Sequence, residues 1–142
     1  MSVTETPDVR GKTALITGAS GGIGGETARR LAKAGAKVAV HYNSNADSAT
    51  KLVDEITSAG GTAIAVGGDV TDEAACKAII ETTVSEFGGL DILVNNAGIS
   101  SFIPFGEMTA EAIDKEFSVN VKSVILMTQA AAPYLENGGR VV

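Results

Sequence analysis

The sequence is poor in cysteine, proline and aromatic residues: its 142 residues include one cysteine, three prolines and no tryptophan, and only 4% are aromatic. The single cysteine, Cys76, excludes an intramolecular disulfide and a cysteine-based zinc cage, and it is typical of a reducing compartment. The opening segment MSVTETPDVRGK has no apolar stretch, and no run approaches the roughly 20 apolar residues of a transmembrane helix. We therefore expect a cytoplasmic protein with no membrane span and no metal site.

Basic residues are also scarce, with 11 lysines and arginines against 17 acidic residues and a net charge of −6. The field of such a protein repels polyanions, so we expect neither nucleic acid nor an anionic membrane as a partner. A small anionic ligand stays compatible with this charge, because backbone N–H groups and a helix dipole can hold a phosphate locally.

Glycine, in contrast, is abundant: there are 17 glycines, and 44% of the residues are hydrophobic. This length and apolar content suffice for one compact domain with a sizeable core. Many glycines and few prolines favour tight turns and close contacts between helices and strands, which are commoner in α/β proteins than in helical bundles.

Short β-prone segments alternate along the chain with longer segments of helical periodicity. The predicted strands are residues 13–17, 37–42, 62–66 and 90–94. Strands separated by helices of this length pair in parallel through right-handed crossovers. We therefore predict an α/β fold, a doubly wound (Rossmann) parallel sheet with helices on both faces. It forms one domain over residues 1–142, truncated at the start of a fifth strand near residues 138–142.

Each predicted helix has one apolar face. The first runs from Gly22 to a stop at Gly35, and the third has Thr71 as its predicted N-cap. The fourth is long, beginning near Thr109 and ending near Pro133 and Tyr134. The predicted apolar faces are Ile23, Thr27, Leu31 and Ala34; Ala49, Leu52, Val53 and Ile56; Cys76, Ile79, Ile80, Thr83, Val84 and Phe87; and Ile113, Phe117, Val121 and Val124.

The strongest local motif is TGASGGIG, residues 17–24, directly between the first strand and the first helix. Gly18 suits a tight turn, Gly22 lets the backbone approach a pyrophosphate, and Gly24 allows close packing of helix on strand. A Walker-type phosphate loop is excluded, because no Gly-Lys-Ser/Thr follows. The alternative for this motif alone is a flexible turn without a ligand.

Three further motifs accompany this turn in order: Asp69-Val70 after the third strand, Asn95-Asn96-Ala97-Gly98 after the fourth, and Asn120-Val121 in the long helix. Together with the Gly-x-x-x-Gly-x-Gly spacing, they resemble the short-chain dehydrogenase/reductase (SDR) family over essentially the whole chain. The resemblance is nearest to the 3-oxoacyl-carrier-protein reductase and naphthol ketoreductase branches. It implies an oxidoreductase that transfers hydride between a nicotinamide cofactor and a carbonyl or alcohol substrate.

The resemblance also implies roles for individual residues. Asn120 is implied to be the catalytic asparagine, which holds a helix kink and a water of the proton relay. Two residues of these motifs have a simpler alternative when taken alone: Asn96 can merely stabilise the strand ends, and Asp69 can be an ordinary turn residue before a helix. The implied cofactor-binding residues are Gly18, Ser20, Gly22 and Ile23 at the pyrophosphate, Asp69 and Val70 beside the adenine, and Asn95, Ala97 and Gly98 at the riboses.

The end of the second strand predicts the choice of cofactor. A carboxylate there would bind the ribose 2′-OH of NAD and repel the 2′-phosphate of NADP, but no acid occurs before Asp47. Tyr42, Asn43 and Ser44 can instead donate hydrogen bonds to a phosphate, so we expect NADP rather than NAD. Gly21 stands where many NADP-dependent members carry a basic residue. We expect the only histidine, His41, to be a strand-end residue rather than a base.

One part of the family pattern is missing. The chemistry requires Tyr-x-x-x-Lys, but Ala46 lies four residues after Tyr42 and Gly138 four residues after Tyr134. Ser100 and Ser101 are better interpreted as loop residues than as the family's serine. We therefore expect this chain to be the N-terminal, cofactor-binding portion of such an enzyme and inactive alone, with uncovered apolar surfaces that make it marginally stable or dependent on a partner.

Three functions stay open at this stage. The first is part of an NADP-dependent reductase with a small-molecule carbonyl or alcohol substrate, a homo-oligomer in its full-length form. The second is a noncatalytic nucleotide-binding fragment or module that requires a partner. The third is a methyl-transfer domain, which would share the fold class but leave Asn95–Gly98 and Asn120 unexplained.

Overall fold

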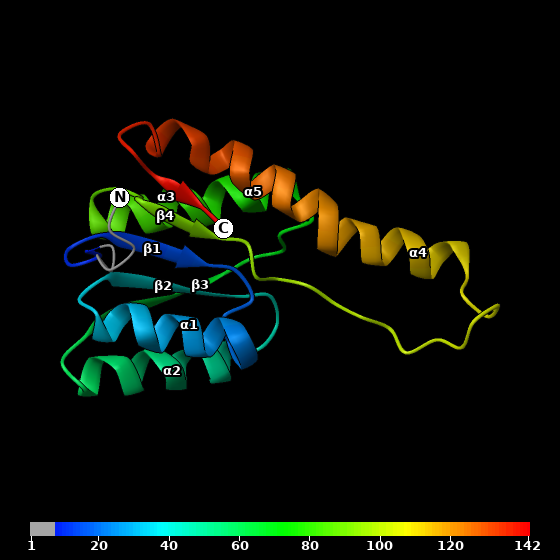
Figure 1. Cartoon of the computed structure of the whole chain (residues 1–142), viewed down its shortest axis with the longest axis horizontal. Helices are drawn as coiled ribbons and strands as arrows, with labels where there is room; N and C mark the ends of the chain where they lie inside the picture. Colours follow the sequence, from blue (N-terminus) through cyan, green and yellow to red (C-terminus); the bar gives the residue numbers. More distant parts are fainter. Residues whose placement is uncertain (1–7) are drawn as a thin grey trace, which may run out of the picture.

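A computed structural model describes residues 8–142; the first seven residues of the predicted domain, and with them most of the opening segment, lie outside it. Five parallel strands form one sheet in the order β3-β2-β1-β4-β5, as predicted for a doubly wound fold (Figure 1). The strands are β1 (Thr13–Ile16), β2 (Lys37–Tyr42), β3 (Thr62–Gly67), β4 (Ile92–Val94) and β5 (Arg140–Val141).

Helices cover both faces of the sheet, as predicted (Figure 1). On one face lie α1 (Gly22–Lys33) and α2 (Ala46–Ser58), and on the other lie α3 (Glu73–Phe87) and α5 (Ser123–Ala131). The last helical stretch is continuous from α4 (Ala110–Phe117) through a π-helical turn, η1 (Ser118–Lys122), into α5, and ends in the 3₁₀ turn η2 (Ala132–Tyr134). No helix within residues 8–142 combines the length and apolarity needed to cross a bilayer.

The central strand β1 shows how the sheet is buried on both faces. Its side chains alternate, so that Ala14 and Ile16 belong to the core beneath α1 and α2, and Leu15 belongs to the core beneath α3 and α5. All three side chains are fully buried. A strand covered on both sides is continuously apolar, and the sequence of β1 therefore lacks the alternation of a half-exposed strand.

The predicted apolar face of α1 is wrong except at Leu31, which is half-buried and packs against the core. Instead of Ile23, Thr27, Leu31 and Ala34, the buried residues are Gly24, Gly25, Ala28 and Ala32. Ile23 is 81% exposed. The reason is the close packing of α1 on the sheet, which leaves room for glycine and alanine but not for larger side chains. The predicted faces of α2 and α3 are confirmed, since Leu52, Ile56, Ile79 and Ile80 are buried.

The start of α3 also differs from the prediction, because Asp72 rather than Thr71 is its N-cap. The Asp72 carboxylate accepts a hydrogen bond from the Ala75 N–H at 2.8 Å. The Thr71 hydroxyl is engaged elsewhere and donates to the Asp69 carboxylate at 2.7 Å. Thr71 therefore belongs to the turn that precedes the helix, and the side chain of the next residue caps it.

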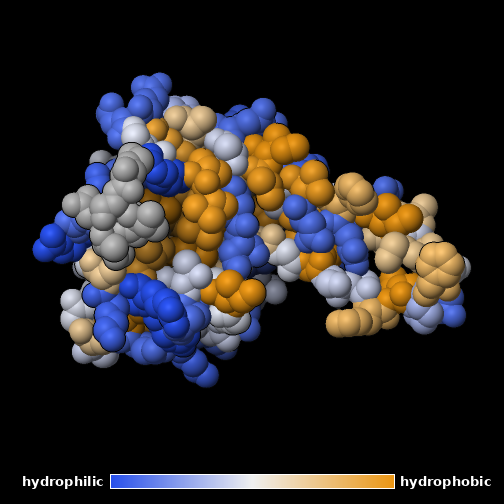
Figure 2. Space-filling model, in the orientation of Figure 1, coloured by the Kyte–Doolittle hydropathy of each residue, from blue (hydrophilic) through white to orange (hydrophobic). Residues whose placement is uncertain are grey.

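The long helix begins and ends as predicted, with Thr109 as N-cap and Pro133 in the terminal 3₁₀ turn. Its predicted apolar face is not buried, however: Phe117 is 63% and Val121 is 47% exposed. The residues that pack on α3 are instead Ser123, Met127 and Ala131. The α4 end and the loop before it project from the body as an arm on which apolar side chains gather (Figures 1 and 2).

The buried and exposed isoleucines of the helices give a matched stability test. We expect Ile79→Ala, at a side chain that is 1% exposed, to lower the free energy of unfolding by about 2–5 kcal/mol, because it leaves a cavity beneath α3. Ile125→Ala changes a side chain that is 54% exposed and should cost less than about 1 kcal/mol. Urea unfolding followed by circular dichroism measures both, and equal costs would contradict the assigned core.

Cys76 is a core residue, as predicted. Its side chain is fully buried, and its thiol donates to the Val70 carbonyl at 3.2 Å. Burial raises the pKa of this thiol to about 11, so almost no thiolate forms at neutral pH. We expect a disulfide reagent at pH 8 to modify Cys76 at least a hundredfold more slowly in the folded protein than in 6 M guanidinium, with free glutathione as the control for reagent activity. Comparable rates would show that this core opens readily.

Candidate nucleotide-binding site

The candidate site lies at the carboxyl ends of β1 and β4, where the strand order reverses and open α/β sheets bind their ligands. Thr17, the residue after β1, joins the two strand ends. Its N–H donates to the Val94 carbonyl at 3.0 Å, and its hydroxyl oxygen accepts from the N–H groups of Asn96 and Ala97, each at 3.0 Å. The glycine-rich turn and the segment after β4 therefore form one connected structure.

The Asn96 side chain completes this connection. Its amide donates to the carbonyls of Thr17 at 3.0 Å and Gly18 at 3.1 Å. A Cβ on Gly24 would collide with that amide and would lie 2.8 Å from the Gly18 oxygen. Gly24 thus allows α1 to approach the turn, as predicted, and Asn96 has the structural role that the sequence left as an alternative.

Two glycines of the motif have backbone conformations that disfavour a side chain. Gly18 has φ +62°, and a Cβ there would lie 2.9 Å from the Ala97 Cα. Gly22 has φ +58° and open space around it, with no atom within 4 Å of the Cβ position. The predicted turn at Gly18 is confirmed, and Gly22 leaves its backbone accessible from outside.

The N-terminus of α1 is the part of the site best suited to an anion. Its N-cap, Gly21, offers no side chain, and its first turn has no acidic residue. In contrast, side chains of Asn45, Asp72 and Thr109 cap α2, α3 and α4. The first N–H groups of α1 are therefore free of side-chain caps and lie at the positive end of the helix dipole. Ser20 lies beside them, half-buried.

The loop after β3 forms the neighbouring wall. The Asp69 carboxylate accepts from both the N–H and the hydroxyl of Thr71, at 2.8 and 2.7 Å, and these hydrogen bonds lower its pKa. The Val70 side chain is buried in the core at 5% exposure. A ligand at this wall can therefore contact the backbone of Val70 rather than its side chain.

The predicted phosphate-binding residues lie at the end of β2. Tyr42 is half-buried, and its ring lies over β3, where a Cβ on Gly67 would come within 2.7 Å of it. Asn43 and Ser44 are exposed in the loop that leads to α2. This arrangement fixes the tyrosine ring and leaves the two polar side chains accessible to a ligand.

Asn120 connects the long helix to the loop after β4. It lies in the π-helical turn η1, its amide oxygen accepts from the Ile99 N–H, and its amide nitrogen donates to the Ile99 carbonyl, both at 2.8 Å. A Cβ on Gly98 would lie 3.2 Å from the Asn120 amide oxygen. The predicted irregularity of the helix at Asn120 is confirmed. The Asn95 amide donates to the Thr128 hydroxyl of α5 at 3.3 Å.

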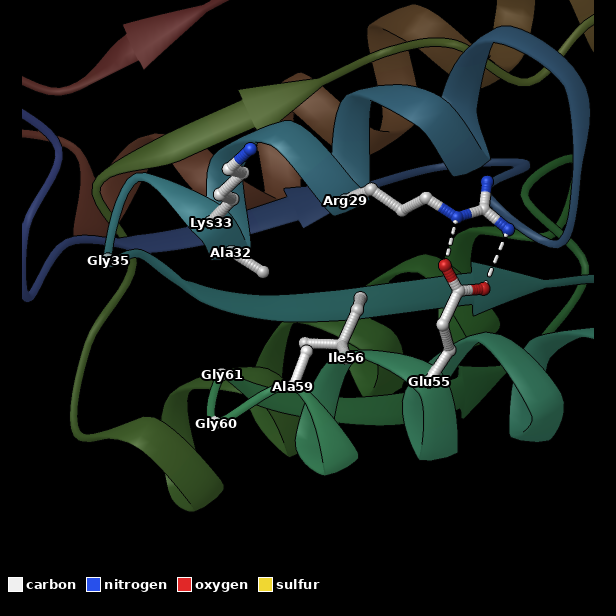
Figure 3. Close-up of a pocket in the computed structure, with 9 residues that line it drawn as sticks. All are labelled: Arg29, Ala32, Lys33, Gly35, Glu55, Ile56, Ala59, Gly60 and Gly61. Carbon is white, nitrogen blue, oxygen red and sulfur yellow. Dashed lines mark hydrogen bonds and ion pairs between the residues drawn. The ribbon is translucent and has the colours of Figure 1, made fainter.

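A surface cavity of about 510 Å³ lies elsewhere, between the C-terminal ends of α1 and α2 (Figure 3). A bidentate ion pair from Arg29 to Glu55, at 2.7 and 2.9 Å, spans one side of it. None of the predicted cofactor-binding residues lines this cavity. We place the candidate site at the strand ends because the uncapped helix N-terminus and the glycine turn meet there.

Sequence reasoning missed two residues of the site, Thr17 and His41. His41 is a strand-end residue, as predicted, but it also contacts both walls of the site: its ring accepts from the Gly18 N–H at 3.0 Å and bonds the Gly68 carbonyl at 2.8 Å. The available signal was positional, since both residues are polar and stand at the carboxyl ends of apolar strands.

Adjacent glycines of α1 provide a test of this geometry. We expect Gly24→Ala to lower the free energy of unfolding by about 1–3 kcal/mol, because the new methyl group displaces the Asn96 amide. Gly25→Ala is the matched control: its nearest contact is 3.4 Å, and alanine is favoured in helices by about 1 kcal/mol. Thermal unfolding of both variants gives the comparison, and a Gly24→Ala protein as stable as Gly25→Ala would refute the close approach of α1.

Comparisons with known proteins find similar sequences and a similar overall fold. The family model described as short chain dehydrogenase matches residues 12–142. The chain is 46% identical to an uncharacterised oxidoreductase of Methylorubrum extorquens over 94% of its own length and 54% of the relative's. It is 42% identical to a hydroxynaphthalene reductase-like protein of Metarhizium guizhouense, over 99% of this chain and 53% of that protein.

Among solved structures, a short-chain dehydrogenase of Burkholderia cenocepacia in complex with NADP is 44% identical, with a TM-score of 0.89, and the match covers 95% of this chain and 55% of that one. The chain thus spans about half the length of the relatives it matches. The family model covers nearly all of the chain, and the identities lie well above 30%. The chain therefore belongs to the short-chain dehydrogenase family of oxidoreductases.

Proposed function

We propose that residues 1–142 are the nucleotide-binding part of an NADP-dependent reductase, C-terminally incomplete relative to the family. The reductase transfers hydride between the nicotinamide and a small carbonyl or alcohol substrate. The observation that carries the proposal is the uncapped N-terminus of α1, which faces the crevice between β1 and β4 behind a glycine turn. That arrangement provides backbone N–H donors for a pyrophosphate without any basic side chain.

The remaining contacts to the dinucleotide follow the topology of the site. Gly18, Ser20, Gly22 and Ile23 face the pyrophosphate; the exposure of Ile23 and the open space at Gly22 support this. Asp69 and the backbone of Val70 flank the adenine. Asn95, Ala97 and Gly98, in the segment joined to the turn through Thr17, lie at the riboses.

The choice of NADP rests on the end of β2. Tyr42, Asn43 and Ser44 present hydroxyl and amide groups there and no carboxylate, so the 2′-phosphate meets donors and no repulsion. The NADP bound by the Burkholderia relative supports the same choice. The resemblance to hydroxynaphthalene reductase-like proteins suggests an aromatic or polyketide-like carbonyl as the substrate class.

The residues of this chain position the cofactor but do not supply the proton. When bound, the cofactor supplies the hydride. Neither Tyr42 nor Tyr134 is followed by a lysine four residues later, so the proton donor for the substrate oxygen comes from outside these 142 residues. Asn120 holds the loop after β4 against the π-helical turn, and this fixed position is compatible with the role in the proton relay that the family resemblance implies.

The exposed apolar residues of the long helix support a homo-oligomer of the whole protein, because a large exposed apolar patch is typical of a protein interface. A cytoplasmic location stays a prediction of the sequence.

The second candidate function, a noncatalytic nucleotide-binding module, is favoured by the absent tyrosine and lysine pair. It shares the binding site and differs only in turnover.

Nucleotide binding tests the site that both functions share, and turnover by the chain alone tests whether the proton donor lies outside it. We expect the chain to bind NADPH at least several-fold more tightly than NADH, measured by the fluorescence of the reduced nicotinamide, and to oxidise none of it with a naphthol-type ketone. Binding of neither nucleotide would overturn the proposed site. Oxidation of NADPH by the chain alone would overturn the assignment of the proton donor to residues outside it.

The cofactor preference has its own test. We expect Asn43→Asp to weaken NADPH binding about tenfold, which corresponds to about 1.4 kcal/mol, because the new carboxylate faces the 2′-phosphate. NADH binding should change less than twofold. Asn137→Asp, the same change at an exposed residue of the turn before β5, is the control. Equal losses for both nucleotides would show that the 2′-phosphate does not lie at Asn43.

A further inference from the structure

His41 is the buried titratable group that joins the most parts of the candidate site. It stands near the end of β2, between β1 and β3, and is 1% exposed. Its backbone carbonyl accepts from the Ala19 N–H at 2.8 Å, and the next carbonyl, that of Tyr42, accepts from the Gly68 N–H at 3.1 Å. Backbone contacts therefore already place His41 between the glycine turn and the loop after β3.

The two ring contacts determine the protonation state of His41. The Gly18 N–H can only donate, so Nδ1, at 3.0 Å, must be an acceptor without a proton. The Gly68 carbonyl can only accept, so Nε2, at 2.8 Å, must carry the proton. The ring is therefore neutral, in the Nε2–H form, and both nitrogens are satisfied.

A second proton on the ring would break one of these contacts. Protonated Nδ1 would face the Gly18 N–H, donor against donor, and the turn would have to move away. Burial lowers the pKa of the ring, and this outweighs two opposing effects, the hydrogen bond to the Gly68 carbonyl and the charge of the Asp69 carboxylate. The Asp69 carboxylate accepts a hydrogen bond from the Thr71 N–H, and the positive charge of Lys122 helps to lower its pKa.

We infer that His41 is a positioning residue of the nucleotide site, whose neutral ring fixes the Gly18 turn, at the pyrophosphate, to the Gly68–Asp69 loop, at the adenine. This inference rests on the proposed function. The new element is that a single side chain, that of His41, sets the distance between the Gly18 turn and the Gly68–Asp69 loop. In this arrangement His41 does not contact the nucleotide. Loss of either ring contact therefore weakens dinucleotide binding, and so does protonation of the ring.

Substitutions can remove the two contacts separately. In His41→Asn the amide oxygen stands near the position of Nδ1, so the contact to Gly18 is retained and that to Gly68 is lost. In His41→Gln the longer amide reaches Gly68, and the acceptor for Gly18 is lost; His41→Leu loses both. Thr83→Val is the matched control, because Thr83 is another fully buried hydrogen-bonding side chain, in α3 and away from the site.

NADPH affinity and its pH dependence between pH 5 and 8 are the decisive measurements. We expect His41→Leu to weaken binding at least tenfold at pH 8, His41→Asn and His41→Gln to lie between it and the wild type, and Thr83→Val to bind within twofold of the wild type. The 2′-phosphate of NADPH itself titrates near pH 6, and this affects the affinity of every variant equally. The effect of His41 is therefore the difference between the affinity–pH profiles of the wild type and a variant. Binding by the wild type should weaken relative to binding by His41→Asn, which cannot titrate, once the pH falls below the midpoint of the His41 ring.

A measurement without nucleotide keeps this inference separate from the proposed function. Because His41 is the only histidine, one pair of ring ¹⁵N signals reports its tautomer and titration directly. We expect Nε2–H at pH 7 and a midpoint below 6.5. An Nδ1–H tautomer, or His41 variants with the affinity and pH profile of the wild type, would overturn the positioning role alone. Failure of the wild type to bind either nucleotide would overturn the proposed function and this inference together.

Discussion

The approach of the glycine-rich turn to the segment after β4 is the constraint on which the rest of the structure depends. Thr17 accepts two backbone N–H groups from that segment, and the Asn96 amide returns two hydrogen bonds to the turn. These contacts require the backbones to lie nearly in van der Waals contact, which only glycine permits at residues 18 and 24. Once the turn is held there, α1 must start directly above the strand ends.

This constraint also explains the composition of α1. A helix that starts so close to the sheet can bury only glycine and alanine, and its larger apolar residues must point elsewhere. Because α1 packs so close to the sheet, the free N–H groups of its first turn lie at the crevice between the carboxyl ends of β1 and β4. A protein with a net charge of −6 can thereby present a local positive site that depends on backbone geometry rather than on lysine or arginine.

The sequence predicted the order of strands and helices because each β segment is apolar and each intervening segment has a helical period. It failed for the face of α1, since periodicity identifies large apolar residues and not the distance at which a helix packs. It also failed at Thr71, because a threonine and an aspartate are both good caps, and only the structure shows which side chain accepts a hydrogen bond from the first helical turn. The observed strand ends differ from the predicted ones by one or two residues, as at the start of β4.

The local geometry was predictable where a motif defines it, as for the turn at Gly18, the close approach at Gly24 and the irregular helix at Asn120. His41 and Thr17 were not predictable, because their partners lie 23 to 80 residues away in the chain. A polar residue at a strand end is common, and only the assembled sheet shows that these two hold neighbouring strand ends together. Long-range partners of this kind are the information that a single sequence lacks.

The π-helical turn has a mechanical consequence for the arm. The loop after β4 is attached to the long helix at two points: Ile99 is held from both sides by Asn120, and the Ser101 N–H donates to the Glu116 carboxylate at 2.7 Å. The loop returns to the same helix at Thr109, which caps α4. Loop and helix therefore form a closed ring, and any displacement of the arm relative to the sheet must carry both together.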